Sequence, residues 1–223
     1  GNRRALIKDH QVRGFIGFLL LTWLIFGTWL WAHSEHAWLD AVRIVAVNVT
    51  SVVTTTGFAL GDYTTWGSFA VLLFFYLTFV GGCSGSTSGG LKIFRFQVAY
   101  VLLKANLQQL IHPRAVIKQQ YNNHNLDEDI VRSLITFSFF FAITIALIAL
   151  GITLTGVDWV TALTGAATAV CNVGPGLGPV IGPAGNFSTL PDAAKWLLTI
   201  GMLLGRLEIL TVLVLFTRVF WKH

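Results

Sequence analysis

Two short strings of small residues, each containing a glycine, are the part of this sequence whose residue types suggest chemistry. The first reads TTTGF and ends the stretch 40–58, and the second reads CNVGPG and ends a similar stretch that begins at Asp158. Glycine lets the backbone turn where other side chains would forbid it. Successive carbonyl oxygens in such a turn can replace the water around a cation. The strings therefore predict a cation-binding backbone with Gly57 and Gly174 at its turns.

The two stretches that carry these strings form an internal repeat. Each begins with an acid, continues through about a dozen small or apolar residues, and ends with a polar pair and a glycine. Asp40 lies 17 steps before Gly57 and Asp158 lies 16 steps before Gly174, so the copies superpose with one residue of slack. Repeats of this kind decide the fold, so they come before any other assignment.

Each copy is too short to cross a bilayer and lies between two longer apolar segments. We therefore expect a re-entrant stretch, in which a short helix dips into the membrane and the chain returns as extended backbone. Asp40 and Asp158 are expected to be N-caps, and the partly negative C-terminal helix ends would then face the two strings. A single copy could equally be an amphipathic surface helix followed by a loop, but two copies with the same flanks favour a pore.

The composition indicates a membrane protein. The 223 residues are 54% hydrophobic and 11% charged, with a mean hydropathy of +0.69, which does not fit a soluble domain with a large core. Cys83 and Cys171 have no metal-ligand spacing and are expected to be free thiols. The formal charge of +5 calls for no nucleic-acid partner, because Lys and Arg on a cytoplasmic face would produce it. A start at Gly1 without methionine predicts a piece of a longer protein.

The order of apolar segments predicts an all-α membrane protein built of two helix–pore loop–helix repeats that have the same orientation in the membrane. The first pore repeat is expected over residues 1–111 and the second over residues 130–220, joined by a cytoplasmic linker at 112–129 in which Asn125 caps the next helix. Within the first repeat we expect a helix at 14–32, a pore helix at 40–53, a filter at 54–58 and a broken helix at 66–111. Within the second we expect a helix at 130–157, a pore helix at 158–170, a filter at 171–175 and a helix at 192–219.

A stretch rich in glycine and serine interrupts the predicted helix at 66–111. It reads GGCSGSTSGG over residues 81–90, and each glycine costs about 1 kcal/mol of helix stability relative to alanine. A phosphate-binding loop would need a strand before it and a lysine followed by serine or threonine, whereas Lys92 precedes Ile93. Close packing of small residues against another helix is the structural alternative. The favoured interpretation is a flexible constriction, rich in hydroxyl groups, below the pore mouth.

Arg206 and Glu208 stand near the middle of the last predicted helix. An ionised residue at that depth must face protein or water. On a straight helix these two residues point to different faces, so each is expected to find a partner elsewhere, and an ion pair with another helix away from the pore is the alternative. His33 and His36 lie in a short polar break and are expected at the level of the lipid headgroups, with a pH sensor as the alternative.

The distribution of charge predicts the orientation in the membrane. Twelve of the 15 Lys and Arg residues precede the first span, lie between residues 92 and 132, or follow Thr217. By the positive-inside rule both termini and the linker are then cytoplasmic, and both strings open to the outside. The outer segments hold five acids against the two bases Arg43 and Lys195, which would concentrate cations at the mouth. The five acids are Glu35, Asp40, Asp62, Asp158 and Asp192.

Four motifs together carry a family resemblance that covers nearly the whole chain. TTTGF, GGCSGSTSGGLKIFRF, CNVGPGLG and GRLEILTVLVLF resemble, in that order, the Trk/Ktr/HKT superfamily of potassium transport proteins, and most closely the C-terminal half of its TrkH-type subunits. One chain of that family holds four such repeats around one pore, so the resemblance implies half of a four-repeat pore, without the N-terminal repeats. CNVGPG differs from TTTGF everywhere but at the glycine, which implies a pore without fourfold symmetry. The resemblance implies potassium as the only metal, and as its filter residues Thr55, Thr56, Gly57, Asn172, Val173 and Gly174.

The same resemblance assigns a gate and partners. Residues 81–90 match the intramembrane gating loop of the family, and Arg206 matches the basic residue of the final helix that lies close to it. The resemblance implies a cytosolic TrkA-type regulatory subunit that binds the nucleotide, so this chain itself needs no cofactor. It also implies pairing of two membrane subunits, contact with membrane lipid, and the bacterial inner membrane as location. The gate would comprise Gly81, Gly82, Cys83, Ser84, Gly85, Ser86, Thr87, Ser88, Gly89, Gly90 and Arg206.

The expected function is potassium uptake through a gated, channel-like pore, not enzymatic catalysis. A unit charge that crosses 100 mV gains about 2.3 kcal/mol, enough to drive accumulation without a second ion. A symporter coupled to H⁺ or Na⁺ is the alternative; it would normally show midplane carboxylates, of which Glu208 is the one candidate. A transporter built of inverted repeats would need copies of opposite topology. A membrane enzyme would need a nucleophile, base and orienting group, and the sequence suggests no such set.

Overall fold

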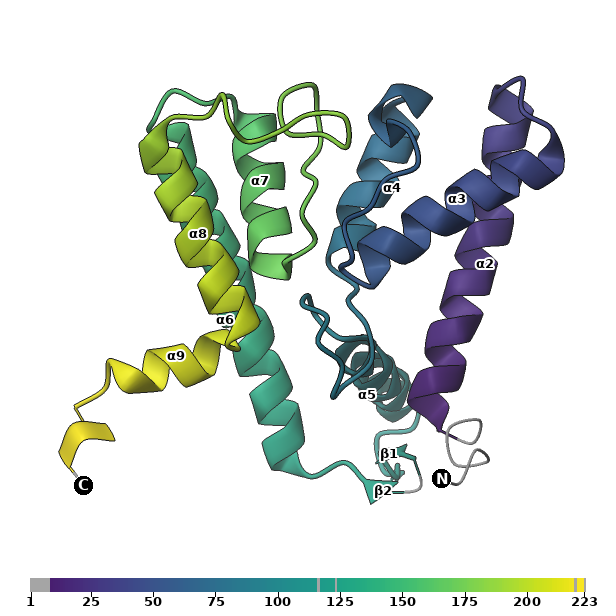
Figure 1. Cartoon of the computed structure of the whole chain (residues 1–223). Helices are drawn as coiled ribbons and strands as arrows, with labels where there is room; N and C mark the ends of the chain where they lie inside the picture. Colours follow the sequence, from purple (N-terminus) through teal and green to yellow (C-terminus); the bar gives the residue numbers. More distant parts are fainter. Residues whose placement is uncertain (1–8, 116, 123, 219, 223) are drawn as a thin grey trace, which may run out of the picture.

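The computed structural model describes residues 9–115, 117–122, 124–218 and 220–222. Most of them form α-helices arranged in two upright groups (Figure 1). Beside the helices, the described residues include one antiparallel hairpin, in which β1 (Gln120–Tyr121) pairs with β2 (His124–Asn125). The prediction of an all-α membrane protein with two helix–loop–helix repeats is confirmed, with this hairpin as the addition. The basic residues Arg3, Arg4 and Lys8, expected before the first span, lie outside the described residues.

The first repeat pairs a long helix with a short one that leans against it. It consists of α2 (His10–His33), α3 (Trp38–Val53), the 3-10 turn η1 (Tyr63–Trp66) and α4 (Ser68–Thr78). The valines of α3 at positions 45, 49, 52 and 53 are buried, as their helical spacing requires. Gly27 lets α2 and α3 come close, since a β-carbon there would lie 2.7 Å from Val42 Cγ2.

The second repeat buries its short helix more completely. It consists of α6 (Glu128–Thr153), α7 (Trp159–Cys171) and α8 (Asp192–Arg206). Nearly every residue of α7 from Thr161 onward is buried, and most are alanine, threonine or glycine. Small side chains allow helix backbones to approach closely where lipid gives no hydrophobic drive for packing. Gly201 of α8 serves the same purpose, because a β-carbon there would lie 2.9 Å from Ile148 Cδ1.

Of the three expected helix caps, one is right and two are wrong. The carboxylate of Asp158 caps α7 by accepting the Thr161 backbone N–H at 2.9 Å. Asp40 does not cap α3, because that helix begins two residues earlier, after Ala37; Asp40 lies in its first turn and pairs with Arg43 at 3.1 Å. A negative side chain in the first turn still interacts favourably with the partly positive N-terminal end of the helix. Asn125 does not cap α6, because it pairs with Gln120 in the hairpin. Asp127 occupies the cap position of α6, but its side chain makes no capping hydrogen bond.

Among the residues that the structure describes, two helices, α2 and α6, are long and apolar enough to cross a membrane, and α8 with α9 (Ile209–Leu215) is a third if that bent pair is one span. Residues 66–111 do not form a further continuous span. At 1.5 Å per residue, the 11 residues of α4 reach about 16 Å, against about 30 Å for the hydrocarbon core. The chain is then non-helical as far as Lys92, and α5 (Ile93–Ile111) runs in another direction, seen nearly end-on in Figure 1.

The predicted continuous helix at 192–219 is wrong. Helix α8 ends at Arg206, α9 begins at Ile209, and the two are bent by 102°. The cause is the left-handed backbone of Glu208, at φ +57°, which no α-helix can contain. Arg206 and Glu208 therefore do not share a straight helix, contrary to the sequence-based argument.

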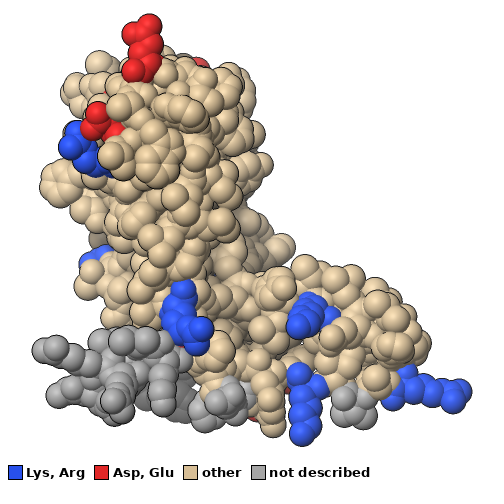
Figure 2. Space-filling model, turned by 90° about the vertical axis from the view of Figure 1, so that its right-hand side faces the viewer, with Lys and Arg blue, Asp and Glu red and all other residues tan. Residues whose placement is uncertain are grey.

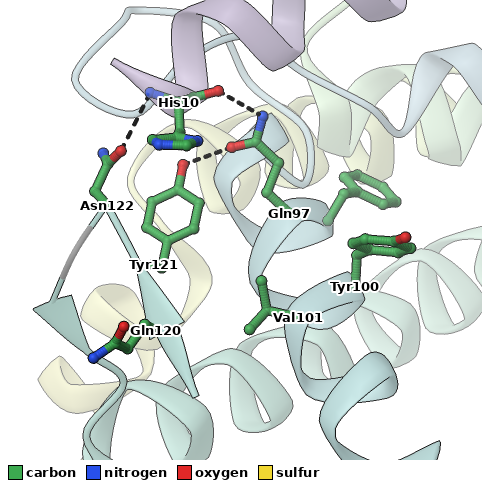
Figure 3. Close-up of a pocket in the computed structure, with 8 residues that line it drawn as sticks. His10, Gln97, Tyr100, Val101, Gln120, Tyr121 and Asn122 are labelled. Atoms are coloured by element: carbon green, nitrogen blue, oxygen red, sulfur yellow. Dashed lines mark hydrogen bonds between the residues drawn. The ribbon is translucent and has the colours of Figure 1, made fainter. Parts of the chain in front are cut away.

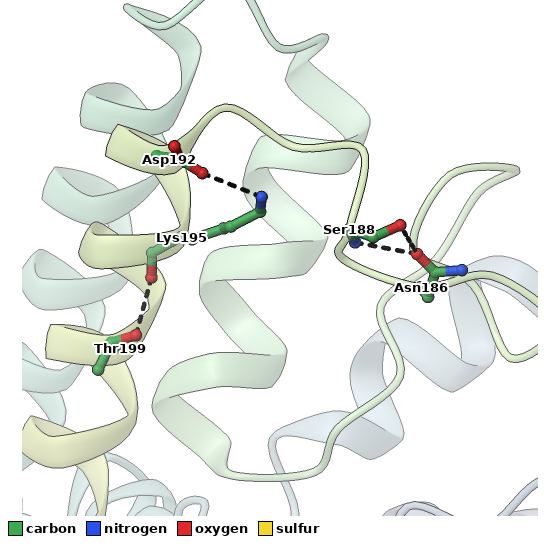
Figure 4. Close-up of polar contacts among 5 residues, drawn as sticks. All are labelled: Asn186, Ser188, Asp192, Lys195 and Thr199. Atoms are coloured by element: carbon green, nitrogen blue, oxygen red, sulfur yellow. Dashed lines mark hydrogen bonds and ion pairs between the residues drawn. The ribbon is translucent and has the colours of Figure 1, made fainter.

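Basic side chains gather towards one end of the molecule. Figure 2 shows acidic side chains at the top of the visible face and most basic ones towards the bottom. The two basic residues expected on the outer side each pair with an acid three residues earlier. Arg43 lies 3.1 Å from Asp40, and Lys195 lies 3.1 Å from Asp192 (Figure 4). These exposed pairs add little stability, but they neutralise both bases.

Candidate functional site

Residues 54–58 (the first turn) follow α3, and residues 171–175 (the second turn) begin with the last residue of α7. The two turns take the same backbone course. Thr56 N donates to Ser51 O at 2.8 Å, and Val173 N donates to Thr168 O at 3.0 Å. Thr55 and Asn172 share a φ of +56°. All these pairs are 117 residues apart, as are Gly57 and Gly174, both at positive φ. When the two copies are aligned 117 residues apart, α3 begins four residues earlier than α7. The copies therefore differ at the starts of their helices, while their turns match.

The backbone N–H groups and carbonyls of the two turns are used differently. The N–H groups of residues 55–57 and 172–174 bond back to the preceding helix. The carbonyls accept no hydrogen bond from any described residue. The carbonyls belong to Thr55, Thr56, Gly57, Asn172, Val173 and Gly174, the six residues predicted for the filter. Val173 is buried, Thr56 and Gly174 are exposed, and the other three residues are half-buried. Such carbonyl groups offer oxygen atoms that a cation could use in place of its water.

Buried polar side chains of the short helices fix the chain just beyond each turn. The Asn48 amide donates to Leu60 O at 3.1 Å and accepts from Leu60 N at 2.7 Å. The Thr164 hydroxyl makes the same two contacts with Leu177, each at 3.2 Å. Leu60 and Leu177 are again 117 residues apart. Sequence reasoning missed both side chains, although a polar residue within an otherwise apolar short helix is the signal that could have found them.

The two turns touch each other. A β-carbon placed on Gly57 would lie 2.3 Å from the carbonyl oxygen of Val173, and one placed on Gly174 would lie 3.8 Å from Gly57 Cα. Figure 1 shows the lower, C-terminal ends of α3 and α7 pointing towards the middle of the molecule. The structure thus brings together the two strings that the sequence places 117 residues apart.

The glycine–serine loop, residues 81–90, lies against both turns. Gly89 N donates to the Thr55 hydroxyl at 3.1 Å, and a β-carbon on Gly89 would lie 2.1 Å from Cys171 O. Hydroxyl groups also fold the loop on itself, since Ser88 Oγ accepts from Gly82 N at 2.9 Å and lies 2.8 Å from Ser86 Oγ. The loop is therefore non-helical, and it reaches the place where the turns meet.

Arg206 reaches the same loop from α8. Its guanidinium donates to the carbonyl of Thr87, and Lys92 Nζ donates to Ser86 O at 3.3 Å. A cavity of about 270 Å³ adjoins the loop here, lined also by Arg95 and Glu208. Within the described ranges the ion pairs are Asp40–Arg43 and Asp192–Lys195, so the alternative of a structural ion pair for Arg206 is not supported there.

The second turn is tied to α8 as well. The Asn172 amide donates to Met202 O at 3.1 Å, and a β-carbon on Gly205 would lie 1.8 Å from Val170 O. The end of α7, the second turn and the residue before Arg206 are therefore in direct contact. All predicted filter and gate residues lie among the described residues, and the contacts above join the two turns, the loop and Arg206 into one cluster.

Comparison with known proteins places this chain in a family. The family model TrkH, described as a cation transport protein, matches residues 3–222. The Trk system potassium uptake protein TrkI of Halomonas elongata is 59% identical over the whole chain, and TrkH of Escherichia coli K12 is 36% identical over 97% of it. The crystal structure of the potassium transporter TrkH from Vibrio parahaemolyticus matches 99% of the chain with a TM-score of 0.90 and 33% identity.

The chain spans under half the length of these relatives, namely 45% of TrkI, 44% of the Escherichia coli TrkH and 47% of the Vibrio chain. The resemblance drawn from the four sequence motifs is confirmed, and the relatives are transport proteins rather than enzymes. The chain belongs to the TrkH family of cation transport proteins.

Proposed function

We propose that this chain forms half of a potassium pathway in a membrane protein for potassium uptake, and that it corresponds to the C-terminal half of its longer relatives. Residues 1–111 and 130–220 are the two pore repeats, and residues 112–129 are the linker between them. The relatives named above are potassium uptake proteins, and the full set of four repeats would complete the pore.

The observation that carries this proposal is the set of six carbonyls in the two touching turns, none of which accepts a hydrogen bond from a described residue. The C-terminal ends of α3 and α7, with their partly negative character, converge on these turns (Figure 1). A potassium ion that loses its water needs oxygen ligands of this kind. Thr55, Thr56, Asn172 and Val173 supply the ligands, and Gly57 and Gly174 permit the turns.

The glycine–serine loop and Arg206 form the gate below this filter. The loop contacts both turns through Gly89, and Arg206 holds the loop through Thr87. A fixed positive charge beside the ion path repels potassium, so the loop and Arg206 close the pathway together. Opening requires the bond between Arg206 and Thr87 to break.

The proposal extends to location and partners. The gathering of basic residues towards one end of the molecule (Figure 2) supports cytoplasmic termini by the positive-inside rule. A cytosolic TrkA-type subunit would bind the regulating nucleotide, and two membrane subunits would pair in the bacterial inner membrane. Permeation is driven by the membrane potential, without a coupled ion.

The test is rubidium uptake by liposomes that contain the complete protein. Arg206→Ala removes a charged donor, and such bonds contribute about 1.5–3 kcal/mol, so we expect uptake to rise about tenfold or more. Shortening residues 84–88 should also raise it. Arg43→Ala is the matched control, because Arg43 is an exposed arginine whose partner is Asp40 on the same helix. Unchanged uptake in both gate variants would remove the gate assignment.

A further inference from the structure

The β1–β2 hairpin packs against the beginning of α2 and against α5 (Figure 3). The Tyr121 hydroxyl donates to Gln97 Oε1 of α5 at 2.5 Å, and its ring meets that of Phe94 edge-on at a centroid distance of 5.2 Å. The Asn122 side chain accepts from His10 N at 3.2 Å. The hairpin is thus joined by side-chain hydrogen bonds to α2, across 112 residues of sequence, and to α5, across 24.

Gln97 of α5 also forms hydrogen bonds to the start of α2. Its Nε2 lies 3.4 Å from the carbonyl oxygens of both His10 and Gln11 and donates to them. Gly14 makes room for the amide, since a β-carbon on Gly14 would lie 2.1 Å from Gln97 Nε2. The Gln97 amide, which can donate and accept at once, therefore links the hairpin to the first turn of α2.

The side chain of Gln11, in the first turn of α2, forms a hydrogen bond to the glycine–serine loop. Its Nε2 donates to Ser84 Oγ at 3.0 Å across 73 residues of sequence, while its backbone N–H is held by the Asp9 carboxylate at 2.7 Å. The other side-chain contacts that hold the loop involve Thr55, Lys92 and Arg206, and the backbone N–H of Ile93, the first residue of α5, donates to Gly82 O at 3.0 Å. Among the side-chain contacts, the Gln11 contact is the one that continues through hydrogen bonds to the hairpin.

We propose that Tyr121, Gln97 and Gln11 form a hydrogen-bonded relay through which the hairpin positions the glycine–serine loop, with Gln11 as the positioning residue that contacts it. This inference rests on the proposed role of the loop as a gate. A contact on the hairpin that displaces Tyr121 releases Gln97, which frees the first turn of α2 and with it the bond to Ser84. Displacement of the hairpin is then the event that frees the loop.

The Tyr121 hydroxyl must be protonated to act as the donor in this relay. Burial and the nearby carboxylate of Asp9 raise the pKa of Tyr121 to about 12, so its hydroxyl keeps its proton at neutral pH and remains a donor. Gln97 and Gln11 carry no charge at any pH. The three relay side chains therefore keep the same protonation state near neutral pH.

The native thiol of Cys83, next to Ser84 and half-buried, reports the position of the loop. We would measure how fast Cys83 reacts with a water-soluble maleimide in the complete protein, by mass spectrometry of the peptide that contains it. One lost hydrogen bond shifts such an equilibrium about two- to tenfold. Tyr121→Phe, which keeps the ring against Phe94, and Gln11→Ala should each raise the rate by that factor. Because the contacts act in series, the double variant should react no faster than the faster single variant.

The controls remove similar groups that make no such contact. Tyr100→Phe alters an exposed tyrosine on α5, and Gln109→Ala alters an exposed glutamine there; neither side chain is hydrogen-bonded to a described residue. Both controls should leave the rate unchanged. Unchanged rates in Tyr121→Phe and Gln11→Ala, or additive effects in the double variant, would overturn the relay.

Rubidium uptake separates this inference from the proposed function. If Cys83 reacts faster in the relay variants while uptake stays unchanged in Arg206→Ala, the relay stands and the gate assignment fails. If Arg206→Ala raises uptake while the relay variants change neither uptake nor the reaction of Cys83, the gate stands and the relay fails.

Discussion

The carbonyl oxygen of Val173 faces the α-carbon of Gly57, so closely that a β-carbon on residue 57 would lie 2.3 Å from it. Gly57 also has a φ of +82°, which side chains other than glycine rarely adopt. The two halves of the proposed filter are therefore in contact through a backbone that leaves no room for any side chain at position 57.

Gly57→Ala should abolish rubidium uptake by the complete protein, because the new methyl group pushes Val173 out of the ion path. Gly61→Ala is the matched control: Gly61 has nearly the same φ, +79°, but a β-carbon there meets nothing within 4 Å. Both variants carry the same backbone strain, of about 1 kcal/mol or more. Equal losses of uptake in the two variants would show that strain alone is responsible.

Gly89→Ala should raise rubidium uptake, because a β-carbon on Gly89 lies 2.1 Å from Cys171 O and keeps the loop away from the end of α7. Backbone atoms cannot yield as a flexible side chain can, so we also expect a loss of about 1–3 kcal/mol in stability. Gly17→Ala is the control: Gly17 lies in α2, and a β-carbon there meets nothing within 4 Å. That change should stabilise the helix slightly and leave uptake unaltered.

Thr168→Val and Ser51→Ala should differ in their effects, although the two residues occupy equivalent places in the repeat. The Thr168 hydroxyl accepts from Gly174 N at 3.1 Å, so its loss leaves that N–H unpaired at a cost of about 1 kcal/mol or more. The Ser51 hydroxyl is buried without a partner among the described residues, so its removal should be neutral or stabilising. Thermal unfolding of the purified protein measures both, and equal destabilisation would contradict the asymmetry.

Asp158→Ala should destabilise the second repeat by about 1 kcal/mol at pH 7, the usual value of an N-cap. Hydrogen bonds from the backbone and hydroxyl of Thr161 hold the pKa of the exposed Asp158 carboxyl below its ordinary value. Its contribution is therefore present above the unfolded pKa, about 3.9, and is lost as pH falls through the lower folded value. The difference in melting temperature between wild type and variant should shrink in acid. Asp40→Ala, which removes an exposed ion pair rather than a cap, should have a smaller effect, and an equal effect would contradict the assignment.

The sequence by itself determined the local elements and the repeat. Apolar periodicity, the acid at Asp158 and the glycines at 57 and 174 fix short helices that end in turns, because propensity, capping and positive φ are properties of neighbouring residues. The density of glycine and serine at residues 81–90 was likewise enough to predict a break in the helix. The register of 117 residues between the two turns follows from the same local patterns.

Only the tertiary structure decided which distant segments touch. The bond from Gln11 to Ser84 has no local signal, since its two residues are 73 apart in the sequence. The bend at Glu208 and the pairing of Asn125 with Gln120 in a hairpin were likewise found only in the structure. A short polar side chain in an apolar helix, such as Asn48, can be read as surface or as core until its partner Leu60 is placed. The meeting of Gly57 with Val173, on which the proposed filter depends, is decided by how the two repeats pack, and no spacing along the chain encodes it.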